Sequence, residues 1–549
     1  MTDTRTELRR IAAEVFGWSE LTGEQFEAME HVMAGHDVLA VLPTGAGKSA
    51  IYQVPTVALD GTTLVVSPLI ALQNDQMDGI EESKAPTAVA VNSAQRESER
   101  KQAWKAIQNG EAEYLFLSPE QLANEDVVVA LAESGISLLV VDEAHCVSAW
   151  GHDFRPDYLR LAPVIERLGH PRVLALTATA ARPVRADIVE RLGLREHREV
   201  IAGFDRPNLH LAVEQFSDVA DKRHTLISFV RSLTAKPATK TGLVYVASRQ
   251  DADDFSGELA QAGLRAAAYH AGMKTAERER VHERFLDDDL DVVVATSAFG
   301  MGIDKPDVRF VVHASVPESL DTYYQQIGRA GRDGEPAEVI LFYRPQDLGL
   351  QKFLTASKAP EDALQQVAET LERHGSPIRA AELKKSTDAP AARRTKAVNL
   401  LEEAGAVGTT ADGRLKYLDP GLPPNEAAQR GAEVAERHQR LVRSRIDMVR
   451  GYAETMGCRR RYLLGYFGEQ LTGLCGNCDT CDFGVAEKQP PASGEFAVDT
   501  PVRHPEWGRG VVMSVDRDRM TILFDDNGYK TLARSAVEER DLLSADETA

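Results

Sequence analysis

A glycine-rich stretch after an apolar run has the residue types of a phosphate-binding loop. Residues 43–49 read PTGAGKS and follow the apolar residues 38–42. Small residues let consecutive backbone N–H groups face anionic oxygens at a helix N-terminus, while the lysine reaches the β- and γ-phosphates and the serine hydroxyl ligates Mg²⁺. The strict pattern asks for glycine where Leu42 stands, so we predict a relaxed P-loop, with an ordinary glycine-rich turn as the alternative. The predicted contacts are Thr44, Gly45, Gly47, Lys48 and Ser49.

A pair of carboxylates follows a second apolar run. Residues 138–141 (LLVV) lead into Asp142, Glu143, Ala144 and His145. Ligands of an open parallel sheet sit outside the carboxyl ends of its strands, so Asp142 and the P-loop can face one site. There Asp142 would hold Mg²⁺ and Glu143 would polarise an attacking water. A solvated loop is the alternative for an isolated Asp-Glu pair.

The third feature is a pair of arginines in residues 325–332 (QQIGRAGR). Arg329 and Arg332 can reach across a cleft to a γ-phosphate, and arginine fingers of this kind contribute ~10³–10⁵ in rate. A nucleotide between two lobes closes them, and hydrolysis lets them open. The three features together predict an NTP-driven motor.

The elements around these residues predict two α/β lobes. Strand-like runs alternate with helical stretches as repeated βα units do. We expect two tandem RecA-like parallel-sheet domains over residues 1–203 and 204–347. The second has predicted strands at residues 243–246, 266–269, 292–295, 310–313 and 339–343.

With these residues in view, the chain resembles the RecQ family of superfamily 2 DNA helicases over residues 12–345 and 458–481. Matching stretches include SPLIALQNDQ at 67–76, TAT at 177–179 and ATSAFGMGIDK at 295–305. The most specific is SAWGHDFRPDY at 148–158, which in RecQ-like helicases senses single-stranded DNA and couples it to hydrolysis. Aromatic rings stack on bases and basic groups meet phosphates, although a core role for the aromatics is the alternative. The resemblance implies DNA contacts by Trp150, His152, Phe154, Arg155 and Tyr158, a catalytic role for His145, and nucleotide contacts by Gly302 and Asp304.

The adenine-binding stretch of the family is present with one departure. Trp18 can stack on the base and the Gln25 amide can pair with its N6/N7 edge, but Thr22 replaces the arginine expected there. ATP remains the expected nucleotide, with looser discrimination. The arginine motif also departs, since Gln326 and Ile327 stand where the family often has a glutamate and a small polar residue.

Four of the five cysteines have the spacing of a structural metal site. Cys458 is followed by Cys475, Cys478 and Cys481. Four thiolates suit a tetrahedral Zn²⁺ with no open position, and a disulfide framework is the weaker alternative. This stretch also resembles the RecQ zinc-binding subdomain, which we place at residues 428–484. Cys146 stands apart and is predicted to be a buried thiol.

Two further segments do not follow the usual family order. Residues 361–374, 379–386 and 391–404 read as helices and 407–418 as a hairpin, which predicts a winged-helix-like insert at 358–420 with its third helix facing DNA. A plain helical spacer is the alternative. A linker at 485–497 leads to a small β-barrel at 498–545 that resembles the Tudor/SH3-like tail of UvrD-type helicases. That resemblance implies a protein partner such as RNA polymerase, and the family's HRDC domain has no room here.

Length and charge complete the prediction. The 549 residues suggest several domains. The net charge of −21 disfavours DNA binding, but eight arginines lie between residues 436 and 461. These form either a DNA-backbone contact or a solvated helical face. With no apolar run of ~20 residues we expect no membrane contact and a cytoplasmic protein, nucleoid-associated if it is bacterial.

The sequence predicts an ATP-dependent helicase that moves 3′ to 5′ on single-stranded and 3′-tailed duplex DNA in repair or recombination, with ATP, Mg²⁺ and structural Zn²⁺. The direction comes from the resemblance alone. An RNA helicase of the same superfamily, a non-unwinding translocase and a DNA-binding scaffold are the alternatives.

Overall fold

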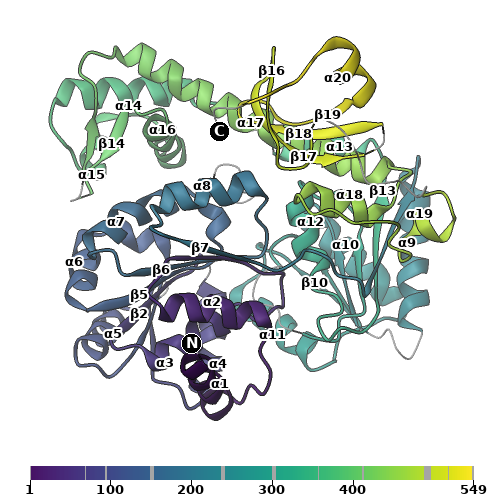
Figure 1. The fold of residues 1–549 in the computed structure, drawn as a ribbon, viewed down its shortest axis with the longest axis horizontal. Coiled ribbons are helices and arrows are strands. Elements are labelled where there is room, and N and C mark those ends of the chain that lie inside the picture. Colours follow the sequence, from purple (N-terminus) through teal and green to yellow (C-terminus); the bar gives the residue numbers. More distant parts are fainter. Residues whose placement is uncertain are drawn as a thin grey trace.

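The protein consists of two parallel-sheet lobes with three smaller units above them (Figure 1). The computed structural model describes residues 2–68, 70–92, 95–148, 154–235, 241–299, 305–355, 358–410, 413–486, 496–516 and 518–546.

The first lobe is a seven-stranded parallel sheet with the order β3-β4-β2-β5-β6-β1-β7. Strands β1, β2 and β4 are buried along their whole length, and β5 and β6 are buried beyond their first residues, because apolar clusters cover both faces. The strands are β1 Val38–Val41, β2 Thr62–Val66, β3 Ala88–Val91, β4 Tyr114–Leu117, β5 Ile136–Val141, β6 Arg172–Thr177 and β7 Arg198–Ile201. The helices are α1 Thr2–Phe16, α2 Gly23–Met33, α3 Ala50–Ala58, α4 Ile70–Glu81, α5 Glu97–Gln108, α6 Glu125–Glu133, α7 Leu161–Arg167 and α8 Arg182–Leu192.

The second lobe is a six-stranded parallel sheet with the order β10-β11-β9-β12-β13-β8. Its strands are β8 Leu209–Gln215, β9 Gly242–Tyr245, β10 Ala266–Tyr269, β11 Val292–Ala295, β12 Phe310–His313 and β13 Ala337–Tyr343. Its helices are α9 Val219–Thr234, α10 Arg249–Gln261, α11 Thr275–Leu286, α12 Leu320–Ile327 and α13 Asp347–Leu354. The two predicted RecA-like parallel sheets are confirmed.

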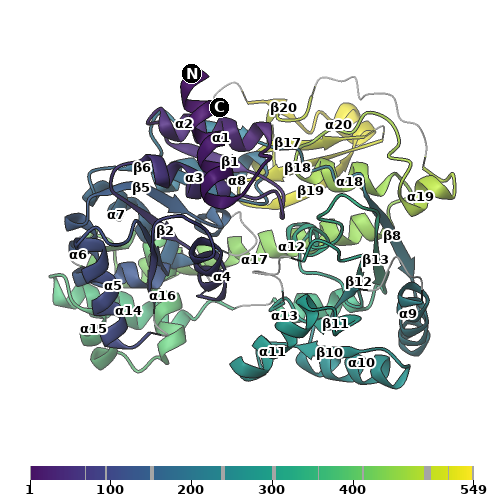
Figure 2. The same cartoon turned by 90° about the horizontal axis from the view of Figure 1, so that it is seen from below.

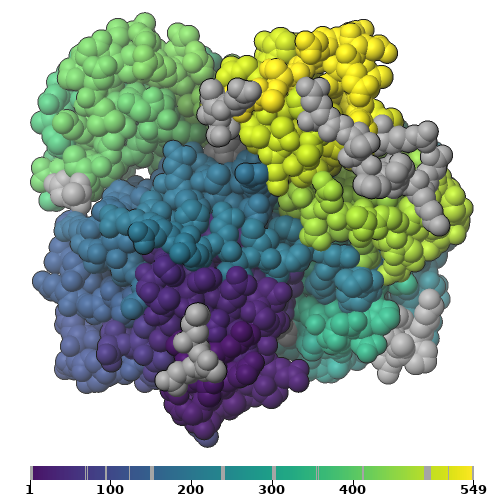
Figure 3. Space-filling view, viewed as in Figure 1, coloured from purple at the N-terminus to yellow at the C-terminus, as the bar shows by residue number. Residues whose placement is uncertain are grey.

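The predicted insert contains three helices and a hairpin around a core of its own. The elements are α14 Glu361–His374, α15 Ala380–Ser386, α16 Ala391–Glu403, β14 Val407–Thr409 and β15 Leu415–Tyr417. They agree with the winged-helix-like prediction to within a residue or two. The insert lies over the first lobe, and the space-filling view shows one small opening between them (Figure 3).

A single long helix, α17 Pro424–Glu454, joins the insert to the zinc module. Its first turns belong to the insert core through Ala427 and Val434. Its last turn packs on the second lobe, where Tyr452 Oη lies 3.0 Å from Tyr323 Oη. Figure 2 shows this helix running between the two halves of the molecule. The short helices α18 Arg459–Tyr466 and α19 Asp479–Asp482 complete the module.

The C-terminal unit is a five-stranded antiparallel sheet with the order β19-β18-β17-β16-β20. Its elements are β16 Pro501–His504, β17 Gly508–Val515, β18 Arg519–Phe524, β19 Gly528–Ala533, α20 Arg534–Arg540 and β20 Ser544–Ala545. The chain turns at 505–507 between β16 and β17, and Gly508 after this turn has a φ of 78°. The unit is docked on the zinc module, where Tyr529 stacks on Tyr466 with ring centroids 4.8 Å apart.

Most arginines of the basic run at 437–461 serve protein contacts. Arg437 pairs with Asp526, Arg450 with Glu454, Arg459 with Asp479 and Arg460 with Asp205. Arg445 is buried. The structure therefore favours a structural role for this run over a DNA-backbone contact.

Candidate active site

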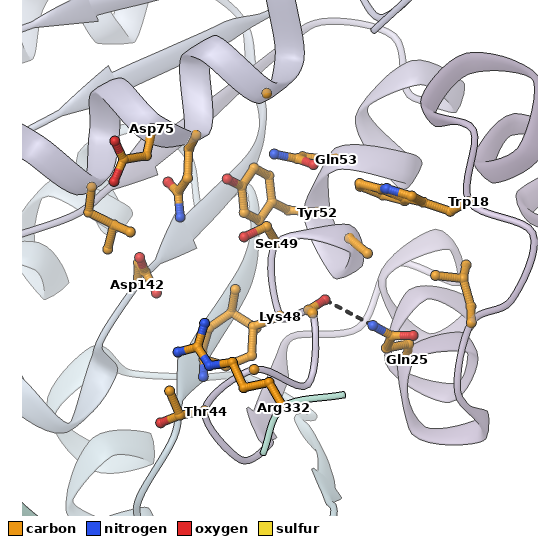
Figure 4. A pocket seen from close by; sticks show the side chains of 18 of the residues that line it. Trp18, Gln25, Thr44, Lys48, Ser49, Tyr52, Gln53, Asp75, Asp142 and Arg332 are labelled. Atoms are coloured by element: carbon orange, nitrogen blue, oxygen red, sulfur yellow. Dashed lines mark hydrogen bonds between the residues drawn. The ribbon is translucent and has the colours of Figure 1, made fainter. Parts of the chain in front are cut away.

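A cavity of about 550 Å³ lies between the P-loop and the second lobe. Figure 4 shows side chains from both lobes around it. Its lining contains most of the predicted nucleotide-site residues: Trp18, Gln25, Thr44, Gly45, Gly47, Lys48, Ser49, Asp142, Glu143, Arg329 and Arg332. The three separate motifs thus meet at one site, as the sequence predicted.

The P-loop connects β1 to α3, and its glycines have left-handed backbone angles. The φ values are 84° at Gly45 and 65° at Gly47, which side-chain-bearing residues rarely adopt. Lys48 folds onto the loop, with Nζ 3.3 Å from the Leu42 carbonyl and 3.5 Å from that of Pro43. Burial lowers the pKa of Lys48, while the charges of Glu143 and Asp142 oppose that shift. A phosphate is the natural partner for this desolvated ammonium group.

The acidic pair lies at the carboxyl end of β5. Asp142 accepts hydrogen bonds from the Glu143 backbone N–H (3.0 Å) and from Ser67 Oγ (3.3 Å). Burial, together with the charge of Glu143, raises the pKa of Asp142 to about 6. Two adjacent carboxylates with this cost of desolvation suit a bound cation.

His145 lies beside Glu143 and Thr177. Its Nδ1 lies 3.3 Å from Glu143 Oε2 and 3.0 Å from Thr177 Oγ1, at the end of β6. The histidine is buried, so it ties the carboxylate to the 177–179 stretch rather than facing solvent.

Arg332 reaches across from the second lobe onto the P-loop. A Cβ on Gly45 would lie 3.0 Å from Arg332 Cδ, so the arginine side chain rests directly on that glycine. Arg329 is buried and lines the same cavity. The predicted approach of both arginines from the other lobe is therefore present in the geometry.

The base-binding residues differ in detail from the prediction. Trp18 lines the cavity and stacks on Phe16, with ring centroids 4.7 Å apart. Gln25 Nε2 donates to the carbonyls of Ala46 and Gly47 at 2.9 Å. Its Oε1 accepts from the Thr22 N–H as part of a capping box at the start of α2. The Gln25 amide is thus bonded to the P-loop, and pairing with adenine would require these bonds to exchange.

The aromatic stretch at 148–158 agrees only partly with the prediction. Base stacking by Tyr158 was wrong: its ring is fully buried and its hydroxyl donates to the Asp142 carbonyl at 3.0 Å. Phe154 is half-buried, and Arg155 Nη1 donates to the Pro68 carbonyl at 3.2 Å. The predicted sites at Trp150, His152, Gly302 and Asp304 lie outside the described residues.

The four predicted zinc ligands converge. The Sγ atoms of Cys458, Cys475, Cys478 and Cys481 all lie within 4.8 Å of one another. Cys475 Sγ and Cys481 Sγ are 3.8 Å apart, which matches the edge of a sulfur tetrahedron with Zn–S bonds of ~2.3 Å. The thiols are free rather than paired as disulfides, and the donor set fits zinc. Cys146 is buried, as predicted.

Sequence reasoning did not assign several residues that line the cavity. Tyr52 and Gln53 lie one turn beyond the P-loop lysine on α3, so helical spacing from Lys48 is the signal that locates them. Asp75 and Gln76 come from α4, within the family stretch at 67–76.

Comparisons with known proteins agree with this geometry. Residues 22–186 match the DEAD/DEAH box helicase family and 221–334 match the helicase conserved C-terminal domain. Residues 425–482 match the RecQ zinc-binding family, and 497–538 match a protein family of unknown function, DUF3553. The chain is 36% identical over 485 residues to the probable ATP-dependent DNA helicase RecS of Bacillus subtilis, covering 88% of this chain and 93% of RecS. The chain belongs to the RecQ family of helicases.

Other relatives of this RecQ-family protein differ in length. The ATP-dependent DNA helicase RecQ of Bacillus subtilis is 31% identical over 95% of this chain and 75% of its own length. The RecQ of Haemophilus influenzae is 34% identical over 86% of this chain, which spans 63% of that protein.

Solved structures share the fold. The helicase MrfA bound to DNA has a TM-score of 0.53 at 17% identity, covering 77% of this chain and 63% of its own. Mss116p bound to single-stranded RNA has a TM-score of 0.52 at 16% identity, covering 67% of this chain and 83% of its own. Among the described residues of this RecQ-family protein, no helix has both the length and the apolar character needed to cross a membrane.

Proposed function

We propose that this RecQ-family helicase couples hydrolysis of ATP, stimulated by single-stranded DNA, to 3′-to-5′ movement and duplex unwinding. The observation that carries the proposal is Arg332 of the second lobe lying on Gly45 of the P-loop. A triphosphate between them would be held by both lobes, so its hydrolysis would change how the lobes are joined.

Different residues of the site have different roles in phosphoryl transfer. Backbone N–H groups of the P-loop and Lys48 bind the β- and γ-phosphates, and Glu143 positions the attacking water. Ser49 and Asp142 would hold Mg²⁺, which supplies charge neutralisation at the phosphates when bound. Arg329 and Arg332 stabilise the charge that develops on the transferred group. Trp18 stacks on the adenine.

DNA is the proposed nucleic acid because the relatives that match over most of the chain are named DNA helicases. Single-stranded and 3′-tailed duplex DNA are the proposed substrates, and DNA repair or recombination is the proposed setting in the cytoplasm. Phe154 and Arg155 are the described candidates for DNA contact in the 148–158 stretch. The RNA-helicase alternative has no comparable support.

The C-terminal β unit is proposed to bind a protein partner such as RNA polymerase. From residue 483 onward, 13 acidic residues stand against 8 basic ones, which disfavours primary contact with DNA. Deleting residues 498–549 should abolish capture of such a partner.

The deciding experiment measures ATP hydrolysis by the full chain without nucleic acid, with single-stranded DNA and with single-stranded RNA, beside Lys48→Ala. Stimulation by DNA that is lost in Lys48→Ala supports the proposal. Equal stimulation by RNA contradicts the DNA assignment, and absence of hydrolysis leaves only a scaffold.

A further inference from the structure

The insert and the first lobe meet at a contact between Phe154 and His438. Phe154 lies nine residues after the DEAH box (residues 142–145). Its ring centroid lies 5.9 Å from that of His438 on α17, at an interplanar angle of 60°. His438 Nε2 lies 3.0 Å from Glu403 Oε1 at the end of α16. One histidine therefore touches the first lobe with its ring and the insert with its nitrogen.

The Phe154 end of this contact is tied to the hydrolysis site. The Arg155 N–H, next in the chain, donates to the Cys146 carbonyl at 2.9 Å. Four residues from Phe154, the Tyr158 hydroxyl donates to the carbonyl of Asp142. A displacement of Phe154 thus acts on a segment that is hydrogen-bonded to Asp142 and to Cys146, which directly follows the Asp142–His145 stretch.

The His438 end of the contact is held by the other units. The Glu403 side chain is only 12% exposed beside it, and the adjacent Arg437 pairs with Asp526 of the C-terminal unit at 3.2 Å. A small cavity of about 50 Å³ at this point is lined by residues of α8, α16, α17 and the C-terminal sheet. Four parts of the molecule converge around this histidine.

We propose that His438 is a positioning residue for DNA-stimulated ATP hydrolysis, which holds Phe154 through ring contact and so links the insert to the DEAH box. This inference rests on the proposed function. Aromatic contacts of this kind have orientation-dependent energies that a non-aromatic side chain does not supply.

Two substitutions separate the two halves of the contact. His438→Gln keeps a donor for Glu403 and removes the ring, whereas His438→Phe keeps a ring against Phe154 and removes the donor. Arg430→Ala is the matched control, since Arg430 lies on the same helix and pairs with Glu426, one turn away, at 2.7 Å.

The test measures kcat and the KM for ATP of each full-length variant with and without single-stranded DNA. We expect His438→Gln to lower the DNA-stimulated kcat by roughly 3- to 10-fold, leaving the DNA-free rate and the KM for ATP unchanged. His438→Phe and Arg430→Ala should retain the stimulated rate. Combining His438→Gln with Phe154→Ala should lower that rate no further than Phe154→Ala alone.

Three results would overturn the inference: an unaffected His438→Gln, an equal loss in His438→Phe, or a parallel fall of the DNA-free rate. An unstimulated wild-type protein would instead remove the proposed function itself, so the two failures are distinguishable.

Discussion

Lys48 and Arg332 bring two positive charges to the same loop from different lobes. Lys48 bonds to carbonyls of its own loop, and the Arg332 side chain rests on Gly45. Like charges at close range repel in a partly desolvated site, so the arrangement is completed by an anion. The contact between the two lobes at this point is therefore expected to be stabilised by a bound phosphate.

Replacing Arg332 by alanine should separate binding from hydrolysis. Since the P-loop is untouched, ATP should still bind, while hydrolysis falls by ~10³ or more as in other enzymes that lose an arginine finger. The measurement is nucleotide affinity by fluorescence beside single-turnover hydrolysis. Arg231→Ala, on an exposed position of α9, is the control, and equal loss of binding in Arg332→Ala would contradict the role.

A buried histidine behind the arginine motif predicts a pH dependence of stability. His313 Nε2 lies 2.8 Å from Gln326 Oε1, and burial lowers the pKa of His313 to about 4. Below pH ~6.5 the histidine of the unfolded chain binds a proton, whereas His313 of the folded chain stays neutral down to about pH 4. The contribution of His313 to the free energy of unfolding is therefore constant above pH ~6.5. It falls by on the order of 3 kcal/mol between pH ~6.5 and 4.

Gln326→Glu should remove this acid sensitivity, because a carboxylate beside His313 favours its protonated form. Urea unfolding of both proteins at several pH values from 4 to 8 gives the difference curve. Parallel pH profiles of wild type and variant would contradict the assignment to His313.

At the scale of elements, the C-terminal sheet is fixed to α17 by a close approach at Gly528. Its φ is 67°, and a Cβ there would lie 2.2 Å from Ser444 Oγ. Ser444 also accepts the Tyr529 N–H at 3.0 Å. The contact between the C-terminal sheet and α17 therefore requires glycine at position 528, because a side chain there would collide with Ser444.

Gly528→Ala should loosen the C-terminal sheet from α17, seen as faster hydrogen exchange in β19 and the middle of α17. Gly508→Ala is a sharp control, since Gly508 has a similar φ of 78° but no atom within 4 Å of its Cβ position. Equal exchange in both variants would assign the effect to backbone strain alone.

The insert offers exposed basic residues on the third helix and the hairpin. Arg393 and Lys416 are exposed, whereas Arg394 and Lys396 donate to backbone carbonyls of Ala389 and Lys358. Two of the three basic residues of this helix therefore make contacts within the insert.

The double variant Arg393→Glu, Lys416→Glu should weaken unwinding of 3′-tailed duplex several-fold, most at low salt, while ATP hydrolysis stimulated by single-stranded DNA persists. Unwinding rates across a salt series provide the measurement. Unchanged unwinding at every salt concentration would favour a plain spacer.

Elements with strong local signals could be predicted from the sequence, and contacts between distant elements could not. The P-loop, the acidic pair and the four cysteines have fixed spacings with direct chemical meaning. The Gln25 amide was misjudged because its partners are carbonyls 21 and 22 residues away, and Tyr158 because burial by a folded neighbour leaves no local pattern. The ring contact of His438 with Phe154 joins residues with no spacing relation at all.

At the scale of the whole molecule, the zinc module fastens the accessory half to the second lobe. Leu211 of β8 bridges to Cys478, and the Val213 N–H donates to Asp479 Oδ2 at 3.0 Å. His210 lies 2.8 Å from Asp482. Loss of the metal should therefore disturb an interface between domains as well as a local fold.

Removing zinc with a chelator should lower the melting temperature and increase proteolysis near residue 475. Purified protein should contain one zinc per chain, Cys475→Ser should lose it, and Cys146→Ser should keep it. Full zinc content in Cys475→Ser would contradict the four-thiolate site. Elemental analysis beside thermal unfolding makes the measurement.

The helix α17 gives the molecule a lever arm. Its 31 residues span about 46 Å at ~1.5 Å per residue, with one end against the second lobe and the other inside the insert. A tilt of about 5° at the lobe end would carry the insert through ~4 Å, comparable to the rise of a nucleotide step. A small rotation of one lobe against the other would thus displace the insert by about the length of one nucleotide step.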